Sequence, residues 1–256
     1  MIGISCPNLS LLPFESALER VSKEFTLWEI IAELEHELLE IESQILYAQN
    51  SYGMTIQVHA PIADLNLGSP AERLRKAAVN ELFLIMDCCE RLSIELITIH
   101  PGAAVAYGND IKPRVREATK RSIEEIDRKL DDMHLKIALE NMPPDNWSIG
   151  YDADELLSMI EDTDVGICLD VGHANIAGTL DTFFRKDIPI LNVHLHDNYG
   201  EFDQHLAIGE GIIDIPSAVF KIEQFFDGSY IVEARSLEEG VVSKKKLSDI
   251  LSGLKS

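Results

Sequence analysis

The fold class is decided by the stretch "ELITIHPGAAVAYGNDIKPRVREATKRSIEEIDRKLDDMHLKIALE", residues 95–140. It begins with an apolar run that ends in His100, continues with a helical pattern over residues 112–133, and closes with a second apolar run that ends in Glu140. Short, evenly apolar runs are typical of strands that are covered on both faces. A strand, a helix and another strand in this order predict a parallel pair joined by a crossover helix.

The same unit repeats on both sides of this stretch. The predicted strands are residues 2–6, 26–31, 55–59, 95–100, 135–140, 165–170, 190–196 and 229–233. The predicted helices are residues 14–22, 36–48, 71–92, 112–133, 152–161, 175–184, 216–226 and 243–254. Eight strand-then-helix units predict one α/β domain over residues 1–256, a single (β/α)8 TIM barrel. An open doubly wound sheet is the alternative, but no GxGxxG motif follows the first strand.

Composition and charge narrow the class of protein. The chain is 46% hydrophobic and 26% charged, which is ordinary for a globular protein with a full core. No apolar run approaches the roughly 18–20 residues of a membrane helix, and the four cysteines show no CxxC spacing. We therefore expect a cytoplasmic protein with reduced cysteines and no membrane contact. The formal charge of −22 makes nucleic acid an unlikely partner, because it repels polyanions.

Ionisable side chains follow the predicted strands. Active sites of (β/α)8 barrels lie at the C-terminal ends of the strands. The third to eighth predicted strands end in His59, His100, Glu140, Asp170, the His194 and His196 pair, and Glu233, and the following loops add His173, Asp203, His205 and Arg235. His194 and His196 share a face because side chains alternate along a strand.

Each of these residues alone is more often a hydrogen-bonded structural residue or a helix cap. Together they place many ionisable groups in one barrel mouth, which is costly unless cations compensate the charges. The pattern therefore predicts a metal site, whereas His36 and His134 lie in polar helical stretches and are expected at the surface. Imidazoles and carboxylates without thiolates favour Zn²⁺ or Mn²⁺, and Fe²⁺ is compatible with the same set. The candidates suffice for one to three ions per chain.

The motifs "HAP", "HPG", "ALEN", "LDVGHA", "HLHD", "DQHLAIGEG" and "VEAR" span residues 59–235. Their order and positions resemble the xylose-isomerase-like TIM-barrel superfamily, which includes sugar isomerases, sugar epimerases and endonuclease IV. Resemblance to the epimerases implies one metal ion held by Glu140, Asp170, His194 and Glu233. It also implies that Glu140 and Glu233 act as acid and base and that His173 binds the substrate.

Resemblance to endonuclease IV implies three zinc ions instead. His59 and His100 with Glu140 match the ligands of the first ion, and Asp170, His194 and Glu233 with the shared Glu140 match those of the second. His173, Asp203 and His205 match those of the third. The loops differ from a DNA-binding enzyme, however, because "AELEHELLEIE" is acidic and neither "APIADLNLGSP" nor "DNYGEFDQH" carries Lys or Arg.

Three functions stay open at this point. The first is a metal-dependent isomerase or epimerase of a sugar or sugar phosphate, in which Glu140 and Glu233 transfer a proton next to a metal-polarised carbonyl. His173, His196, Arg235 and Glu29 are its expected substrate-binding residues, Glu29 because isomerase-like members often carry an acidic residue on the second strand. The second is a zinc-dependent phosphoesterase that resembles endonuclease IV. The third is a metal-containing barrel that binds a partner without catalysis; the substrate and any homo-oligomer are left undetermined.

Overall fold

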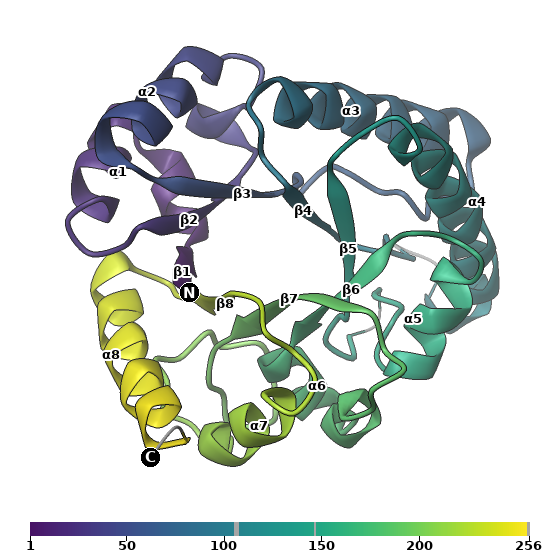
Figure 1. Ribbon diagram of the computed structural model, residues 1–256. Helices are drawn as coiled ribbons and strands as arrows, with labels where there is room; N and C mark the ends of the chain where they lie inside the picture. Colours follow the sequence, from purple (N-terminus) through teal and green to yellow (C-terminus); the bar gives the residue numbers. More distant parts are fainter. Residues whose placement is uncertain (105–107, 146, 255–256) are drawn as a thin grey trace.

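Eight parallel strands form a closed ring that is surrounded by helices (Figure 1). The computed structural model describes residues 1–104, 108–145 and 147–254. The strands are β1 (Ile2–Ser5), β2 (Leu27–Ile31), β3 (Thr55–His59), β4 (Leu96–Ile99), β5 (Lys136–Glu140), β6 (Gly166–Asp170), β7 (Ile190–Leu195) and β8 (Tyr230–Glu233). Their order around the ring follows the sequence, and β8 pairs with β1 to close it. The predicted single (β/α)8 barrel is confirmed.

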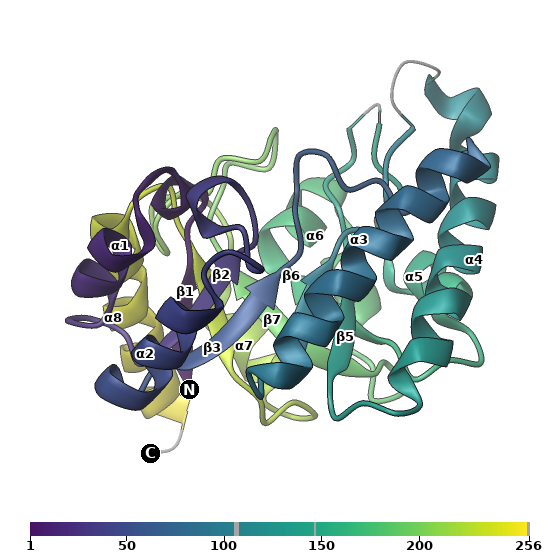
Figure 2. The ribbon, with the colours of Figure 1, turned by 90° about the horizontal axis from the view of Figure 1, so that it is seen from above.

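The helices lie outside the ring (Figures 1 and 2). They are α1 (Phe14–Val21), α2 (Glu42–Tyr52), α3 (Glu72–Arg91), α4 (Lys112–Leu130), α5 (Ala153–Ile160), α6 (Val171–Ala177), α7 (Ile215–Ile222) and α8 (Leu237–Leu254). Short 3-10 segments occur at Pro7–Leu11, Leu34–His36, Gly108–Ile111 and Leu180–Phe183. Among the described helices, none combines the length and apolarity that a membrane span requires.

The strand register places the predicted site residues at one end of the barrel. His59 of β3 pairs with Ile31 and Thr98 on its two sides, Asp170 pairs with His194, and Glu233 pairs with Ser5. Paired residues of neighbouring strands point to the same face of a sheet. The terminal side chains of β3, β5, β6 and β8, and that of His194 one residue before the end of β7, therefore enter the same mouth.

Several helix boundaries differ from the prediction, most clearly those around α2, α6 and α8. Residues 34–36 form a 3-10 turn that starts at Leu34 with a φ of 57°, so α2 begins only at Glu42. The helix expected at 175–184 is divided, because α6 starts directly after β6 and ends at Ala177, followed by Gly178 in the left-handed region and a separate 3-10 segment. α8 begins at Leu237 rather than at residue 243.

His36 lies in the core, contrary to its expected surface position. Its ring packs edge-on against Phe14 and Trp28 with both centroid distances at 5.4 Å, and the residue is 1% exposed. Burial is the main reason that the pKa of His36 falls to about 4. His134, by contrast, is exposed as predicted.

Candidate metal centre

Four buried side chains from the ends of β5 to β8 form the inner group. Glu140, Asp170, His194 and Glu233 each offer one ligand atom, and these atoms lie within 4.8 Å of one another. Nδ1 of His194 is 3.1 Å from Oε1 of Glu140 and 3.0 Å from Oε1 of Glu233. Oδ2 of Asp170 is buried without a hydrogen-bond partner. An orphaned carboxylate oxygen in such a cluster is a position where a cation would be stabilised.

A second group uses the other oxygen of Glu140. Oε2 of Glu140 lies 3.0 Å from Nε2 of His59 and 3.2 Å from Nε2 of His100. The two imidazoles meet edge-on, with ring centroids 4.8 Å apart. Glu140 thus connects this group with the inner group.

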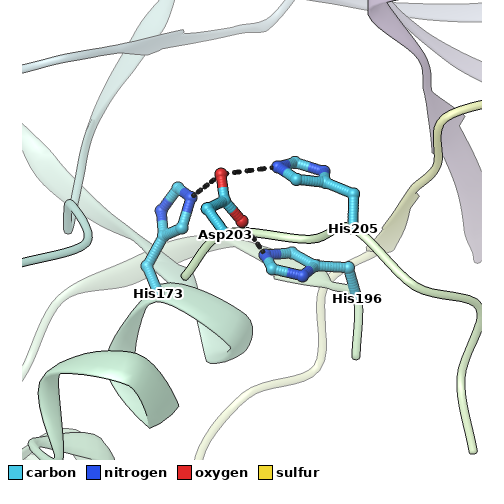
Figure 3. A group of neighbouring side chains, drawn as sticks. All are labelled: His173, His196, Asp203 and His205. Carbon is cyan, nitrogen blue, oxygen red and sulfur yellow. Dashed lines mark hydrogen bonds and ion pairs between the residues drawn. The ribbon is translucent and has the colours of Figure 1, made fainter. Parts of the chain in front are cut away.

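The outer group lies beyond the inner one and is shown in Figure 3. The carboxylate of Asp203 lies among three imidazoles: Oδ2 is 2.9 Å from Nε2 of His205 and 3.3 Å from Nε2 of His173, and Oδ1 is 3.4 Å from Nε2 of His196. His173 belongs to α6 and His196 follows β7, whereas Asp203 and His205 come from the loop after β7. The structure therefore brings together all nine of the metal-ligand candidates that the sequence indicated, and it adds His196 and the thiol of Cys168 to them.

Backbone carbonyls fix the tautomer of several histidines. Nδ1 of His59 donates to the carbonyl oxygen of Ala60 at 2.8 Å, and Nδ1 of His173 donates to that of Asn141 at 2.9 Å. A carbonyl only accepts, so in each neutral ring Nε2 carries a lone pair that faces a carboxylate. These Nε2 atoms lie 3.0 Å from Glu140 in the case of His59 and 3.3 Å from Asp203 in the case of His173. Two acceptor atoms so close repel each other unless a proton or a metal ion lies between them. The donor set and its tautomers therefore fit a divalent metal ion such as Zn²⁺ or Mn²⁺.

The charges of the buried side chains also fit a bound divalent metal ion. Burial alone would raise the pKa of Glu140 and lower that of His194. The surrounding imidazoles outweigh burial at Glu140, and the acidic groups around His194, which are Cys168, Glu29, Glu233 and Glu140, outweigh it at His194. The pKa of Glu140 consequently lies well below its ordinary value, and the pKa of His194 lies well above its own. Without a metal, the carboxylates are thus balanced by imidazolium ions. A metal ion that binds here must displace those protons.

Glu29 lies beneath the inner group rather than at its surface. Its carboxylate is fully buried inside the barrel, with Oε2 accepting from Nδ2 of Asn192 at 2.7 Å and Oε1 at 3.0 Å from Nε2 of His194. The carboxylate of Glu29 therefore lies behind His194, away from the mouth where the sequence predicted a contact with substrate. Asn192 was not indicated by the sequence, since an isolated Asn within a strand carries no signal of its own.

Arg235, which the sequence predicts to bind substrate, is paired with an acidic side chain. Its guanidinium makes two contacts with the carboxylate of Glu239 in α8, at 2.6 and 3.0 Å, and the side chain is half exposed. Asn141, which follows Glu140, was not singled out from the sequence. Its side-chain oxygen accepts from the backbone N–H of Asp170 at 2.8 Å, and its carbonyl orients His173.

A cavity opens beside His100. Its volume is about 620 Å³, and its lining includes Ile62, Leu65, Met142 and Trp147 from the loops after β3 and β5. This volume falls within the roughly 300–1,000 Å³ of small-molecule sites. The metal-ligand groups are thus adjacent to a space that accommodates a small, partly apolar molecule.

The chain is a (β/α)8 barrel with imidazoles and carboxylates gathered at its strand ends. Barrels of this kind catalyse reactions of small molecules and hydrolysis of phosphoesters, so the fold alone does not decide between them. Residues 23–249 match the family model described as "Xylose isomerase-like TIM barrel". The chain belongs to this family.

The relatives of the chain include proteins named as endonucleases and proteins named as epimerases. An uncharacterized protein of Methanocaldococcus jannaschii is 33% identical over 97% of this chain and 88% of its own length. A probable endonuclease 4 of Aquifex aeolicus is 28% identical over 70% of each chain. Among solved structures, a D-tagatose 3-epimerase-like protein aligns over 99% of this chain and 98% of its own with a TM-score of 0.91 and 29% identity. The relatives of the chain therefore include an epimerase-like protein and a probable endonuclease.

Proposed function

We propose that this protein is a metal-dependent epimerase or isomerase of a small sugar. The observation that carries the proposal is the pairing of Glu140 and Glu233 across His194, each with one oxygen at the inner group. Two carboxylates beside one substrate carbon suit removal of a proton and its return at the opposite face or at a neighbouring carbon. The epimerase-like relative with a TM-score of 0.91 supports the same reaction class.

Glu140 and Glu233 differ in how far their side chains are exposed to the barrel mouth. The side chain of Glu233 is 10% exposed, whereas that of Glu140 is 1% exposed and is shared with His59 and His100. Glu233 is therefore the proposed group that takes the proton from the substrate, and Glu140 is the proposed partner on the other side. A divalent ion held by Glu140, Asp170, His194 and Glu233 would polarise the substrate carbonyl and stabilise the negative charge that forms beside it.

The surroundings favour an uncharged sugar over a sugar phosphate. The guanidinium of Arg235, the basic group nearest in sequence to the inner ligands, is paired with Glu239. Of the lining residues that the structure describes around the cavity beside His100, none is Lys or Arg. Phosphate recognition in proteins usually relies on such groups or on helix N-termini.

The test is hydrogen exchange at the substrate carbon. Manganese- or zinc-loaded protein is incubated in D₂O with a panel of ketoses and ketose phosphates, and NMR follows deuterium incorporation and the appearance of a new epimer. We expect incorporation beside the carbonyl of at least one free ketose. Glu233→Gln should reduce the rate at least about 100-fold, while the exposed His134→Gln serves as the control. Full exchange by Glu233→Gln, or no exchange with any member of the panel, would contradict the proposal.

Phosphoester hydrolysis is the second candidate, because all three ligand groups are present. A metal-loaded sample is tested with a phosphodiester such as bis(p-nitrophenyl) phosphate and with abasic duplex DNA. Hydrolysis that depends on His59, His100 and the outer group, without sugar exchange, would favour this candidate over the first.

A further inference from the structure

His196 occupies a position in the outer group that neither predicted metal-ligand set includes. The residue is fully buried, and its Nε2 atom lies 3.3 Å from Oδ1 of Asp170 and 3.4 Å from Oδ1 of Asp203. Its ring stacks on that of His205 with centroids 4.1 Å apart and planes 6° apart. Figure 3 shows that His196 points to the same carboxylate as His173 and His205.

The Nε2 atom of His196 has no hydrogen-bond partner, although it is buried. On the other side of the ring, Nδ1 donates to the backbone carbonyl of Asp197 at 3.3 Å. This bond places the proton of a neutral ring on Nδ1 and leaves the lone pair of Nε2 directed at the cluster. A neutral imidazole binds a metal ion through such a lone pair, which lies in the plane of the ring. Because the planes of His196 and His205 are nearly parallel, the partly exposed ring of His205 would turn out of the stack for both lone pairs to reach the same ion.

Gly172 makes room for this ring. A Cβ atom at Gly172 would lie 2.1 Å from Cε1 and 2.2 Å from Nε2 of His196. The glycine has ordinary backbone angles, so space rather than conformation requires it. The absence of a side chain at Gly172 in α6 thus leaves the space in which the imidazole of His196 reaches the outer group.

We propose that His196 is a fourth protein ligand of an ion in the outer group, together with His173, Asp203 and His205. Three imidazoles and one carboxylate form a nitrogen-rich set that suits tetrahedral Zn²⁺. Four protein ligands complete the coordination of a structural zinc and leave no position for substrate or a reactive water. The inner group differs, because three carboxylates and one imidazole are oxygen-rich and compatible with Mn²⁺ and with higher coordination.

The role of this zinc is to fasten the loop at residues 198–205. Asp203 and His205 come from this loop, and His205 has a φ of 47°, a strained value for a residue other than glycine. Tyr199 and Phe202 in the same loop are exposed, so their side chains do little to hold it. The ion would connect the loop to α6 through His173 and to the end of β7 through His196. The proposal concerns this outer ion alone and does not depend on the reaction proposed above.

The experiment measures zinc binding to the full chain. Metal-free protein is titrated with Zn²⁺ against a chromophoric chelator, and Co²⁺ is substituted to record the visible absorption that distinguishes four-coordinate from higher-coordinate sites. We expect wild-type protein to hold one ion that gives the intense four-coordinate absorption. His196→Ala should weaken the binding of that ion at least about 100-fold and remove the four-coordinate absorption. His134→Ala should match the wild type in both measurements.

Gly172→Ala provides an independent variant, because it removes no ligand and instead displaces the ring of His196. It should weaken the same ion, and His196→Gln replaces His196→Ala if the alanine variant does not fold. Glu233→Gln should affect the inner ion and keep the four-coordinate absorption, which separates this proposal from the proposed reaction. Unchanged zinc affinity and cobalt absorption in the folded His196 and Gly172 variants would overturn the assignment.

Discussion

The carboxylate of Glu29 lies 3.0 Å from Nε2 of His194, on the side of the ring opposite to the Nδ1 atom that faces Glu140 and Glu233. A carboxylate behind a metal-binding imidazole fixes the orientation of the ring and increases its basicity. We therefore expect Glu29→Gln to weaken metal binding at the inner group by roughly 10- to 100-fold. Competitive titration with a chelator measures this change.

The same variant separates a positioning role from substrate binding. With saturating metal, Glu29→Gln should leave the KM for a ketose substrate nearly unchanged, because Glu29 is buried below His194. Glu24→Gln is the control, since Glu24 is an exposed glutamate near the start of the same strand. A raised KM with unaltered metal affinity would return Glu29 to the substrate-binding role expected from the sequence.

DNA is expected to bind weakly. The chain carries a formal charge of −22, and its loop over residues 32–42 contains five glutamates in "AELEHELLEIE". Protein–DNA affinity relies on Lys and Arg contacts to phosphates and is greatest at low salt. A fluorescence anisotropy titration with abasic duplex at low ionic strength should therefore show little binding, beside an abasic endonuclease as positive control. Tight binding that weakens steeply with added salt would reverse the order of the two proposed functions.

The barrel was predictable because its signal is repeated. Apolar runs such as Leu96–Ile99 are buried on both faces, and eight repeats with intervening helices leave few alternatives. Helix boundaries were less predictable where local geometry overrides pattern. Asp170 is both a strand end and the N-cap of α6, with its side chain accepting from the backbone N–H of His173, so no loop separates the two elements.

The ligand candidates were predictable because they stand directly at strand ends, where the barrel geometry gathers them. The positions of Glu29 and His196 were not predictable from the sequence. Each depends on how far the residue lies from the barrel mouth along the barrel axis, and residue type does not reveal this. Glu29 is one layer below the mouth, paired with Gln57 of β3 rather than with His59. His196 depends on the space left by Gly172, which is a contact between two distant parts of the sequence.

Arg75 connects α3 with α4 in the outer shell of the barrel. Its buried guanidinium lies 2.6 Å from Glu72 and 2.8 Å from Glu125, and it donates to Ser122 at 3.0 Å. Arg75→Met should lower the free energy of unfolding by roughly 3 kcal/mol, because it leaves the half-buried Glu125 with less compensation. Lys76→Met removes an exposed partner of the same Glu125 and should cost about 1 kcal/mol or less. Urea denaturation checks both values, and equal losses would show that burial of Arg75 contributes nothing.

Stability should depend on pH through His36. The ring is buried between Phe14 and Trp28, its Nε2 has no hydrogen-bond partner, and its pKa falls to about 4 from an ordinary value near 6.5. Below pH 6.5 the unfolded chain takes up a proton that the folded chain does not, so the folded state loses stability as pH falls from 6.5 toward 4. Above pH 6.5 both states are neutral at this residue and the effect disappears.

His36→Phe keeps an aromatic ring in the cluster and removes the titrating group. Between pH 7 and pH 5, the wild type should lose about 2 kcal/mol more of its unfolding free energy than the variant. Urea denaturation of both proteins at the two pH values gives this difference directly, and the titration of the barrel mouth cancels because both proteins share it. The exposed His134→Phe should follow the wild type at both pH values. If His36→Phe loses as much stability as the wild type on acidification, His36 takes up its proton equally in the folded and unfolded protein, and its burial does not lower its pKa.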